Sequence, residues 1–102
     1  MTDCIFCKLK DSLDDDKYVY KDEYCYAIND INPKAKVHIL IIPNVHVASL
    51  NEVDDTMLIK HMFDAIKIIV KEKGITDFKT LINTGKAAGQ EVFHLHIHIL
   101  AN

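Results

Sequence analysis

The chain has no excess of basic residues and no long apolar run. Its 12 Lys and Arg residues are outnumbered by 15 Asp and Glu residues, which gives a formal net charge of −3. Proteins that bind a phosphodiester backbone present a basic surface, so long nucleic acid is not an expected partner. The longest aliphatic run, from Ile39 to Ile42, is far too short to cross a bilayer, so no membrane is an expected partner either.

A secretion signal and an even number of cysteines are also missing. The first residues, Met1 to Cys4, contain neither a basic segment nor an apolar one, so we expect a cytoplasmic protein. The three cysteines cannot all pair within one chain. In a reducing compartment the Cys-x-x-Cys formed by Cys4 and Cys7 is more naturally a metal or redox pair than a disulfide. Cys25 stands alone in an apolar segment, and we expect it in the core.

No repeat, linker or low-complexity segment divides the 102 residues, so we expect one domain over residues 1–102. The hydrophobic pattern predicts an α+β domain with about five strands in a mainly antiparallel sheet, because most connections are short and polar. One long helix and a short N-terminal helix complete it. The short helix is predicted over residues 4–10, the strands over residues 18–21, 24–29, 37–42, 79–84 and 92–100, and the long helix over residues 54–73.

The long helix is apolar over most of its circumference. Asp54 or Asp55 is placed to cap its N-terminus, and Gly74 is placed to end it. Two adjacent apolar stripes leave only a narrow polar stripe. The apolar arc that they form is wider than contact with one sheet needs. We therefore expect a two-fold dimer that buries a second face of the helix, although a deeply embedded helix would explain the same pattern. The two stripes are Leu58, Met62, Ala65 and Ile69, and Ile59, Phe63, Ile66 and Val70.

Three of the six histidines fall in the segment His94-Leu95-His96-Ile97-His98, inside the last predicted strand. Because alternate side chains of a strand share a face, the histidines lie on one face and the apolar residues on the other. Three imidazoles on one face would be an unfavourable way to build a core, so a functional role is favoured. Metal binding and nucleophilic or acid–base chemistry are both open, and different histidines can serve each.

Strand geometry limits the metal role. Alternate residues of a strand are roughly 6.5 to 7 Å apart, so one metal ion with bonds of about 2.0 to 2.1 Å could hardly bind both His94 and His98. Cys4 and Cys7 are available as further ligands of a tetrahedral zinc ion. A neutral imidazole, in contrast, has a nitrogen free to attack phosphorus. The glycine-containing loop at residues 85–90 can offer backbone N–H groups to the same phosphate, although it lacks the Gly-Lys-Ser/Thr ending of a Walker loop.

Together these motifs resemble those of the histidine-triad (HIT) family, in particular its Hint branch. The segment from His94 to Leu100 matches the family signature His-x-His-x-His-x-x, in which x is apolar. The likeness covers nearly the whole chain. It includes Cys4-Ile5-Phe6-Cys7-Lys8, Asp30-Ile31-Asn32-Pro33, residues 38–43, Asn44-Val45-His46, Asn83-Thr84-Gly85 and Gly89-Gln90-Glu91-Val92-Phe93.

The resemblance implies a HIT-like fold and a nucleotide hydrolase or transferase. Its expected substrates are purine nucleoside 5'-phosphoramidates or related conjugates, which react through a covalent nucleotidyl-histidine. By position His96 matches the nucleophile, and His98 and His38 match the histidines that organise phosphate and relay protons. Asp30 matches the acidic residue that binds the ribose hydroxyls, with Ile31 against the base. The other nucleotide-binding positions that the resemblance assigns are Asn83, Gly89, Gln90, Glu91 and Val92.

The resemblance also implies a structural zinc ion, because family members with an N-terminal Cys-x-x-Cys bind zinc through it. The matching ligands are Cys4, Cys7, His46 and His94. A site with four protein ligands is closed, so the metal would stabilise the fold and orient His94 without polarising substrate. No organic cofactor is expected. The implied partners are a purine nucleotide similar to AMP or GMP and a second copy of the chain.

Two departures from the Hint pattern concern the leaving group. Glu91 stands where many Hint proteins have a serine that helps to protonate the leaving amine, and a carboxylate would do so only in its protonated form. The chain ends at Asn102, so we do not expect selection of substrate by a C-terminal tail.

Two other functions are compatible with these motifs. One is a dinucleoside polyphosphate hydrolase or nucleotidyltransferase of a neighbouring HIT branch. The other is a nucleotide-binding or zinc-stabilised module without turnover. Three histidines on one face favour an enzyme, since binding alone does not need them.

Overall fold

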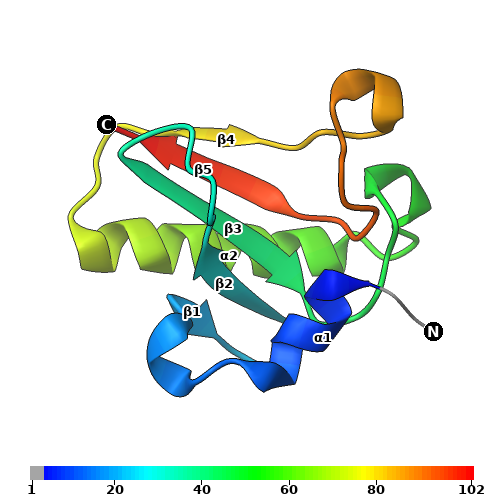
Figure 1. Cartoon of the computed structure of the whole chain (residues 1–102), viewed down its shortest axis with the longest axis horizontal. Helices are drawn as coiled ribbons and strands as arrows, with labels where there is room; N and C mark the ends of the chain where they lie inside the picture. The colour runs from blue at the N-terminus through cyan, green and yellow to red at the C-terminus, as the bar shows by residue number, and fades with distance from the viewer. Residues whose placement is uncertain (1–3) are drawn as a thin grey trace.

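The structure, a computed structural model, describes residues 4–102 as an α+β fold in which a five-stranded sheet lies between two α-helices (Figure 1). This is the predicted fold class. Both the N-terminal limit of the predicted domain 1–102 and the inferred lack of a secretion signal involve residues 1–3. These residues lie outside the described part of the chain, so both points stay predictions.

The sheet is antiparallel at every pairing within residues 4–102, in the order β1-β2-β3-β5-β4. The first two strands form a hairpin: β1 pairs with β2, and the Asp22 carboxylate accepts hydrogen bonds from the backbone N–H groups of Tyr24 and Cys25 in the turn. Strand β3 occupies the centre, between β2 and β5. The strands are β1 (Tyr20–Lys21), β2 (Cys25–Asn29), β3 (Val37–Pro43), β4 (Lys79–Leu81) and β5 (Ile97–Ala101).

Strands β1, β2, β4 and β5 are shorter than predicted, and β4 and β5 differ most. Strand β5 begins at Ile97 instead of residue 92, and β4 ends at Leu81 instead of residue 84. A strand ends where its ladder ends: β3 pairs with β5 only as far as Ile97, and the N–H of Leu95 donates to Val47 O in a loop instead. As a result His94 and His96 lie in an extended segment before the strand, and only His98 lies within it.

Both helices have identifiable ends. Helix α1 (Ile5–Ser12) extends two residues beyond the predicted turn, and the Cys4 sulfur accepts a hydrogen bond from the N–H of Cys7 at its start. Helix α2 (Met57–Lys73) begins after Asp55, whose carboxylate accepts from the N–H of Met57 as predicted. Gly74 ends α2 with a φ of 68°, a left-handed conformation that glycine adopts without strain. Single 3-10 turns lie at Asp15–Lys17, Leu50–Glu52 and Lys86–Ala88.

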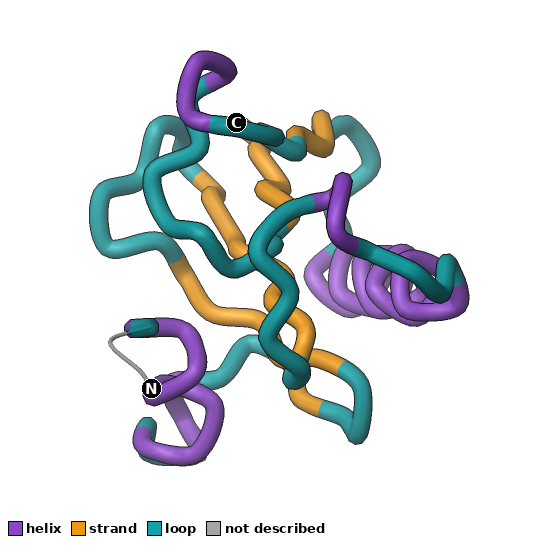
Figure 2. Tube along the Cα trace, turned by 90° about the vertical axis from the view of Figure 1, so that its right-hand side faces the viewer, coloured by secondary structure: helices purple, strands orange, loops and turns teal. Residues whose placement is uncertain are grey.

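The two helices cover opposite faces of the sheet, which Figure 2 shows with α1 and α2 on either side of the strands. The α2 face contains the larger core, in which Cys25 is fully buried as predicted. The α1 face contains a smaller apolar cluster around Phe6 and Tyr26. No helix within residues 4–102 has both the length and the apolar character needed to span a membrane. The buried side chains of α2 are Met62, Ala65, Ile66, Ile69 and Val70.

Candidate active site and metal cluster

The histidines of the 94–98 segment all lie on the α1 side of the sheet, as strand alternation predicted. Phe6 of α1 contacts the rings of His94 and His96, and the ring centroids of His96 and His98 are 4.9 Å apart. The intervening apolar side chains pack on the α2 side. The alternation therefore holds although the regular strand begins only at Ile97, because the backbone before it is already extended.

Backbone carbonyl groups determine which nitrogen of two buried histidines carries the proton. A carbonyl oxygen only accepts hydrogen bonds, so a ring nitrogen bonded to it must be the protonated one. His96 Nδ1 lies 2.8 Å from His94 O, which leaves His96 Nε2 unprotonated and free to act as a nucleophile. His94 Nε2 lies 2.9 Å from Pro43 O, which leaves the Nδ1 of that ring unprotonated.

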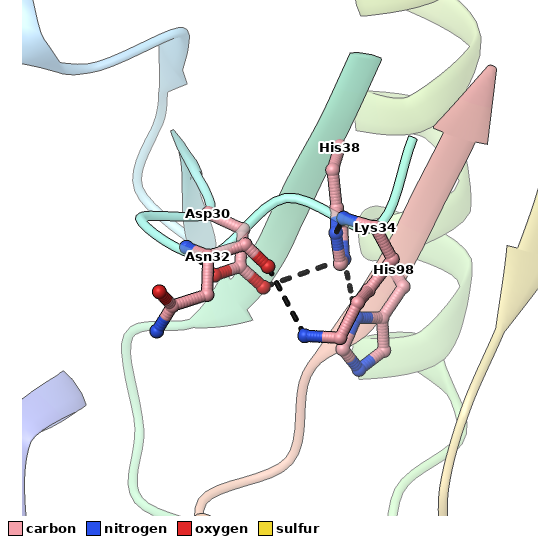
Figure 3. Close-up of polar contacts among 5 residues, drawn as sticks. All are labelled: Asp30, Asn32, Lys34, His38 and His98. Atoms are coloured by element: carbon pink, nitrogen blue, oxygen red, sulfur yellow. Dashed lines mark hydrogen bonds and ion pairs between the residues drawn. The ribbon is translucent and has the colours of Figure 1, made fainter. Parts of the chain in front are cut away.

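A third backbone group orders the pair formed by His38 and His98 (Figure 3). The N–H of Lys34 donates to His38 Nδ1 at 3.0 Å, so the proton of this ring resides on Nε2. His38 Nε2 lies 2.8 Å from His98 Nδ1 and 3.4 Å from Asp30 Oδ2. His98 accepts this bond at Nδ1, so its Nε2 is a donor, and it is the one buried side-chain nitrogen or oxygen within residues 4–102 that has no hydrogen-bond partner.

Burial favours the neutral form of His96 and His98. Desolvation lowers the pKa of His96 below its ordinary value of 6.5, and desolvation, followed by repulsion from His96 and His38, lowers the pKa of His98 to about 4. At neutral pH the site therefore presents an unprotonated nitrogen on His96 beside an N–H donor on His98. A nucleophile next to a fixed donor is the arrangement that attack on a phosphorus centre requires.

These groups line one cavity of about 530 Å³, a size typical of small-ligand sites. The lining combines polar groups, among them the histidines and Asp30, with apolar residues of α1 and the sheet. The predicted residues that line it are Asp30, Ile31, His38, Asn83, Gly89, Glu91, Val92, His96 and His98.

Gln90 lies behind the cavity instead of lining it. Its side chain is almost fully buried, where it accepts from the N–H of Gly85 and donates to the carbonyl oxygens of Ala48 and Val92. Gly89 next to it has a φ of 94°, which favours glycine. These contacts hold the 85–90 loop, of which Gly89 lines the cavity.

The four predicted metal ligands, Cys4, Cys7, His46 and His94, converge at one place. Their ligand atoms all lie within 4.8 Å of one another. His94 Nδ1 is 3.3 Å from Cys4 Sγ and 3.1 Å from His46 Nδ1, and Cys7 Sγ is 3.3 Å from His46 Nδ1. Tetrahedral zinc with bonds of about 2.0 Å to nitrogen and 2.3 Å to sulfur separates its ligands by roughly 3.3 to 3.8 Å.

The chemistry of this cluster also fits zinc. Because His94 donates through Nε2 to Pro43 O, its Nδ1 offers a lone pair to the cluster, as a metal ligand must. Two cysteine sulfurs and two histidine nitrogens form a recurrent ligand set of structural zinc sites. Contact with two histidines favours a metal role for Cys4 and Cys7 over a redox role.

A second group, Asp30, His38 and His98, also brings three ligand atoms within 4.8 Å. Here the hydrogen bonds disfavour a metal. The N–H of Lys34 occupies the lone pair of His38 Nδ1, so His38 Nε2 holds the ring proton and has no lone pair to give. This group is therefore suited to hydrogen bonding and proton transfer.

Sequence reasoning missed three contributors to the site: the Phe6 ring, the Lys34 N–H and the Pro43 carbonyl. The one signal for Phe6 is its place between Cys4 and Cys7. The other two groups belong to the backbone, and no residue type marks them.

Comparison with known proteins gives consistent matches. The HIT domain family matches residues 12–102, so Cys4 and Cys7 lie outside the matched part. Protein HitA of Neisseria gonorrhoeae is 48% identical, over 98% of this chain and 96% of that protein. The purine nucleoside phosphoramidase of Escherichia coli (strain K12) is 36% identical, over 80% of this chain and 72% of that protein.

A solved structure agrees with the fold. A histidine triad protein from Clostridium difficile superposes with a TM-score of 0.92 at 42% identity, and the match covers all of this chain and 92% of that one. The arrangement of strands and helices described above is therefore also that of an experimentally determined protein.

Proposed function

The chain belongs to the histidine-triad (HIT) family, and from this premise we propose that it hydrolyses purine nucleoside 5'-phosphoramidates or related nucleotide conjugates. The similarity to HIT proteins supports a hydrolase role in general, and the relative named as a purine nucleoside phosphoramidase supports this substrate class. The observation that carries the proposal is the hydrogen bond from His96 Nδ1 to His94 O, which leaves a free nitrogen in the cavity.

In the proposed reaction His96 Nε2 attacks the α-phosphorus. A nitrogen–phosphorus bond forms to the enzyme, the bond from phosphorus to the leaving nitrogen breaks, and the departing amine takes up a proton through the His38–His98 pair. Water then attacks the adduct and returns a proton to this pair, the bond to His96 breaks, and the nucleoside monophosphate leaves. The His98 Nε2–H donates to a phosphate oxygen, and His38, hydrogen-bonded to His98 and close to Asp30, takes part in proton transfer.

The same cavity would bind the rest of the nucleotide. The Asp30 carboxylate, one-fifth exposed, would accept hydrogen bonds from the ribose hydroxyls. Ile31, with 91% of its surface exposed, and the apolar part of the lining would cover the base. Asn83 and Gly89, neighbours in the cavity lining, would contact the phosphate, and Glu91 and Val92 of the same lining would bind the rest of the nucleotide.

Zinc is the proposed metal of the Cys4, Cys7, His46 and His94 cluster. Bound there, it would supply four strong bonds between α1, the loop after β3 and the segment before β5. Metal analysis of protein purified without added metal tests this, with about one zinc per chain expected. Absence of zinc would return Cys4 and Cys7 to a redox or purely structural role. A cytoplasmic location stays a prediction.

We also propose the two-fold dimer that the wide apolar arc of α2 suggested. Of the eight residues in the two stripes, the core buries or partly buries all but Phe63, which is 46% exposed. Met57 and Ile68, which lie outside the two stripes, are 50% and 42% exposed and extend the exposed apolar surface of α2. The exposed edge strand β4 adds a further surface. Light scattering at micromolar concentration tests the dimer: the wild type should have twice the chain mass and Phe63→Asp the monomer mass. A monomeric wild type would contradict it.

Intact-mass analysis of quenched reactions tests the catalytic proposal. The substrates are adenosine 5'-phosphoramidate, diadenosine tetraphosphate and a nucleoside diphosphate sugar. The wild type should show a nucleotidyl adduct and turnover, and His96→Asn neither. His61→Asn is the matched control, because this histidine stacks on Tyr24 away from the cavity.

The substrate comparison also decides between related functions. Preference for diadenosine tetraphosphate would favour the dinucleoside polyphosphate hydrolase, and transfer of the nucleotide to an acceptor would favour the transferase. Binding without adduct or turnover for all three substrates would contradict an enzyme and leave a nucleotide-binding module.

A further inference from the structure

Phe6 joins the metal cluster to the candidate nucleophile. It lies between Cys4 and Cys7 in the first turn of α1, and only 7% of its surface is exposed. Its ring meets two histidines edge to face, with centroids 5.1 Å from His96 at 76° and 5.9 Å from His94 at 83°. Aromatic pairs favour this geometry, so both contacts are stabilising.

We propose that Phe6 is a positioning residue that holds the imidazole of His96 in the orientation for attack. This inference rests on the proposed function, because it takes His96 as the nucleophile. Phe6 also lines the cavity, so the simpler alternative is that it only contacts the nucleotide.

His96 needs a contact of this kind. Its Nδ1 is held by a single hydrogen bond to His94 O, and a ring held at one nitrogen can still tilt about that bond. Its Nε2 must stay free of protein hydrogen bonds in order to attack. Packing against the ring therefore has to supply the remaining orientation, and Phe6 and His98 are the rings that contact it.

Phe6 is itself held firmly enough to do this. The hydroxyl of Tyr26, a fully buried residue of β2, donates to Phe6 O, which ties this turn of α1 to the sheet. On either side of Phe6, Cys4 and Cys7 contact His94 and His46. The backbone that carries the Phe6 ring is thus fixed from the sheet and from the cluster. A displacement of the reacting atom by about 1 Å can cost on the order of a hundredfold in rate, so loss of this support should be measurable.

The test is the kinetics of Phe6→Leu and Phe6→Met with adenosine 5'-phosphoramidate. Leucine and methionine are both apolar and only moderately smaller than phenylalanine, and the flexible methionine side chain can adapt to the gap, so at least this variant should keep the fold. We expect kcat to fall about 10- to 100-fold while KM changes less than about threefold. A raised KM with unchanged kcat would show that Phe6 only binds nucleotide, and would overturn the proposal.

Leu13→Ala is the matched control. Leu13 packs on the same apolar cluster as Phe6 but lines neither the cavity nor the metal cluster. Its loss should lower the unfolding temperature and leave kcat within about twofold. If Leu13→Ala lowers kcat as much as Phe6→Met at equal loss of stability, the effect is general destabilisation and the proposal is wrong.

A measurement without substrate completes the test. Nitrogen-15 spectra of the wild-type His96 ring should show one state with Nδ1 protonated, and Phe6→Met should show a mixture or broadened signals. Identical spectra would contradict a positioning role. If the wild type itself forms no adduct, the proposed function fails. If the wild type reacts and both Phe6 variants keep its kcat, only the present inference fails.

Discussion

Protonation of His98 should weaken the fold at mildly acidic pH. Burial lowers the pKa of this imidazole from 6.5 to about 4 in the folded protein. Between these two values the unfolded chain binds the proton and the folded protein does not, so the free energy of unfolding decreases as the pH falls. The full difference corresponds to about 3 kcal/mol, present above pH 6.5 and lost by pH 4.

Urea unfolding of the wild type and His98→Gln at several pH values from 7.5 to 4.5 measures this effect. Burial also lowers the pKa of His94 and His96, and both residues remain in the variant. The two proteins therefore differ in how steeply the free energy of unfolding changes with pH, and this difference reports on His98 alone. We expect the free energy of unfolding of the wild type to fall more steeply with decreasing pH, by up to about 1.4 kcal/mol per pH unit. Parallel curves for the two proteins would refute a buried, neutral His98.

Three further changes give separate tests. Cys4→Ser should abolish zinc binding and lower the unfolding temperature by about 10 °C or more, as measured by calorimetry with metal analysis; a variant that keeps its metal would exclude Cys4 as a ligand. Gly89→Ala should cost about 1 kcal/mol in urea unfolding, because alanine is strained at a φ of 94°, and unchanged stability would show that the loop relaxes. Glu91→Ser should raise kcat/KM about three- to tenfold for conjugates with an anionic leaving group, because a carboxylate on the cavity wall repels them. Equal kcat/KM in both proteins would place Glu91 away from the leaving group.

Local patterns predicted the main elements because the forces that form them are local. Gly74 ends α2 since it alone among its neighbours adopts the left-handed conformation without strain, and Asp55, next to the N-cap Thr56, accepts a hydrogen bond from the first N–H of the helix. The ends of β4 and β5 could not be predicted in this way. They depend on where the partner strand stops pairing. The pairing of β3 with β5 runs from Ala101 back to Ile97, so β5 begins at Ile97.

The candidate site was predictable in its residues and not in its hydrogen bonds. Nine of the predicted residues line one cavity, and the four metal ligands converge, although Gln90 lies behind the wall. Motif positions carry this information. The supporting groups carry no such mark: Phe6 looks like an ordinary core residue, and the N–H of Lys34 is available at almost any residue type.

By itself the sequence determined that three imidazoles lie on one side of an extended segment, with apolar residues on the other, because side-chain alternation is a property of the backbone. It also indicated that one metal ion could hardly bind both His94 and His98, because residue spacing along an extended segment sets the distance between them. Only the tertiary structure decided the state of the His94 and His98 rings. Pro43 O, 51 residues away from His94 in the sequence, and His38 Nε2, 60 residues away from His98, select the nitrogen that holds the proton in these two rings. These partners meet only when β3 comes together with β5 and the segment before it, so the chemistry of these two histidines is a consequence of folding.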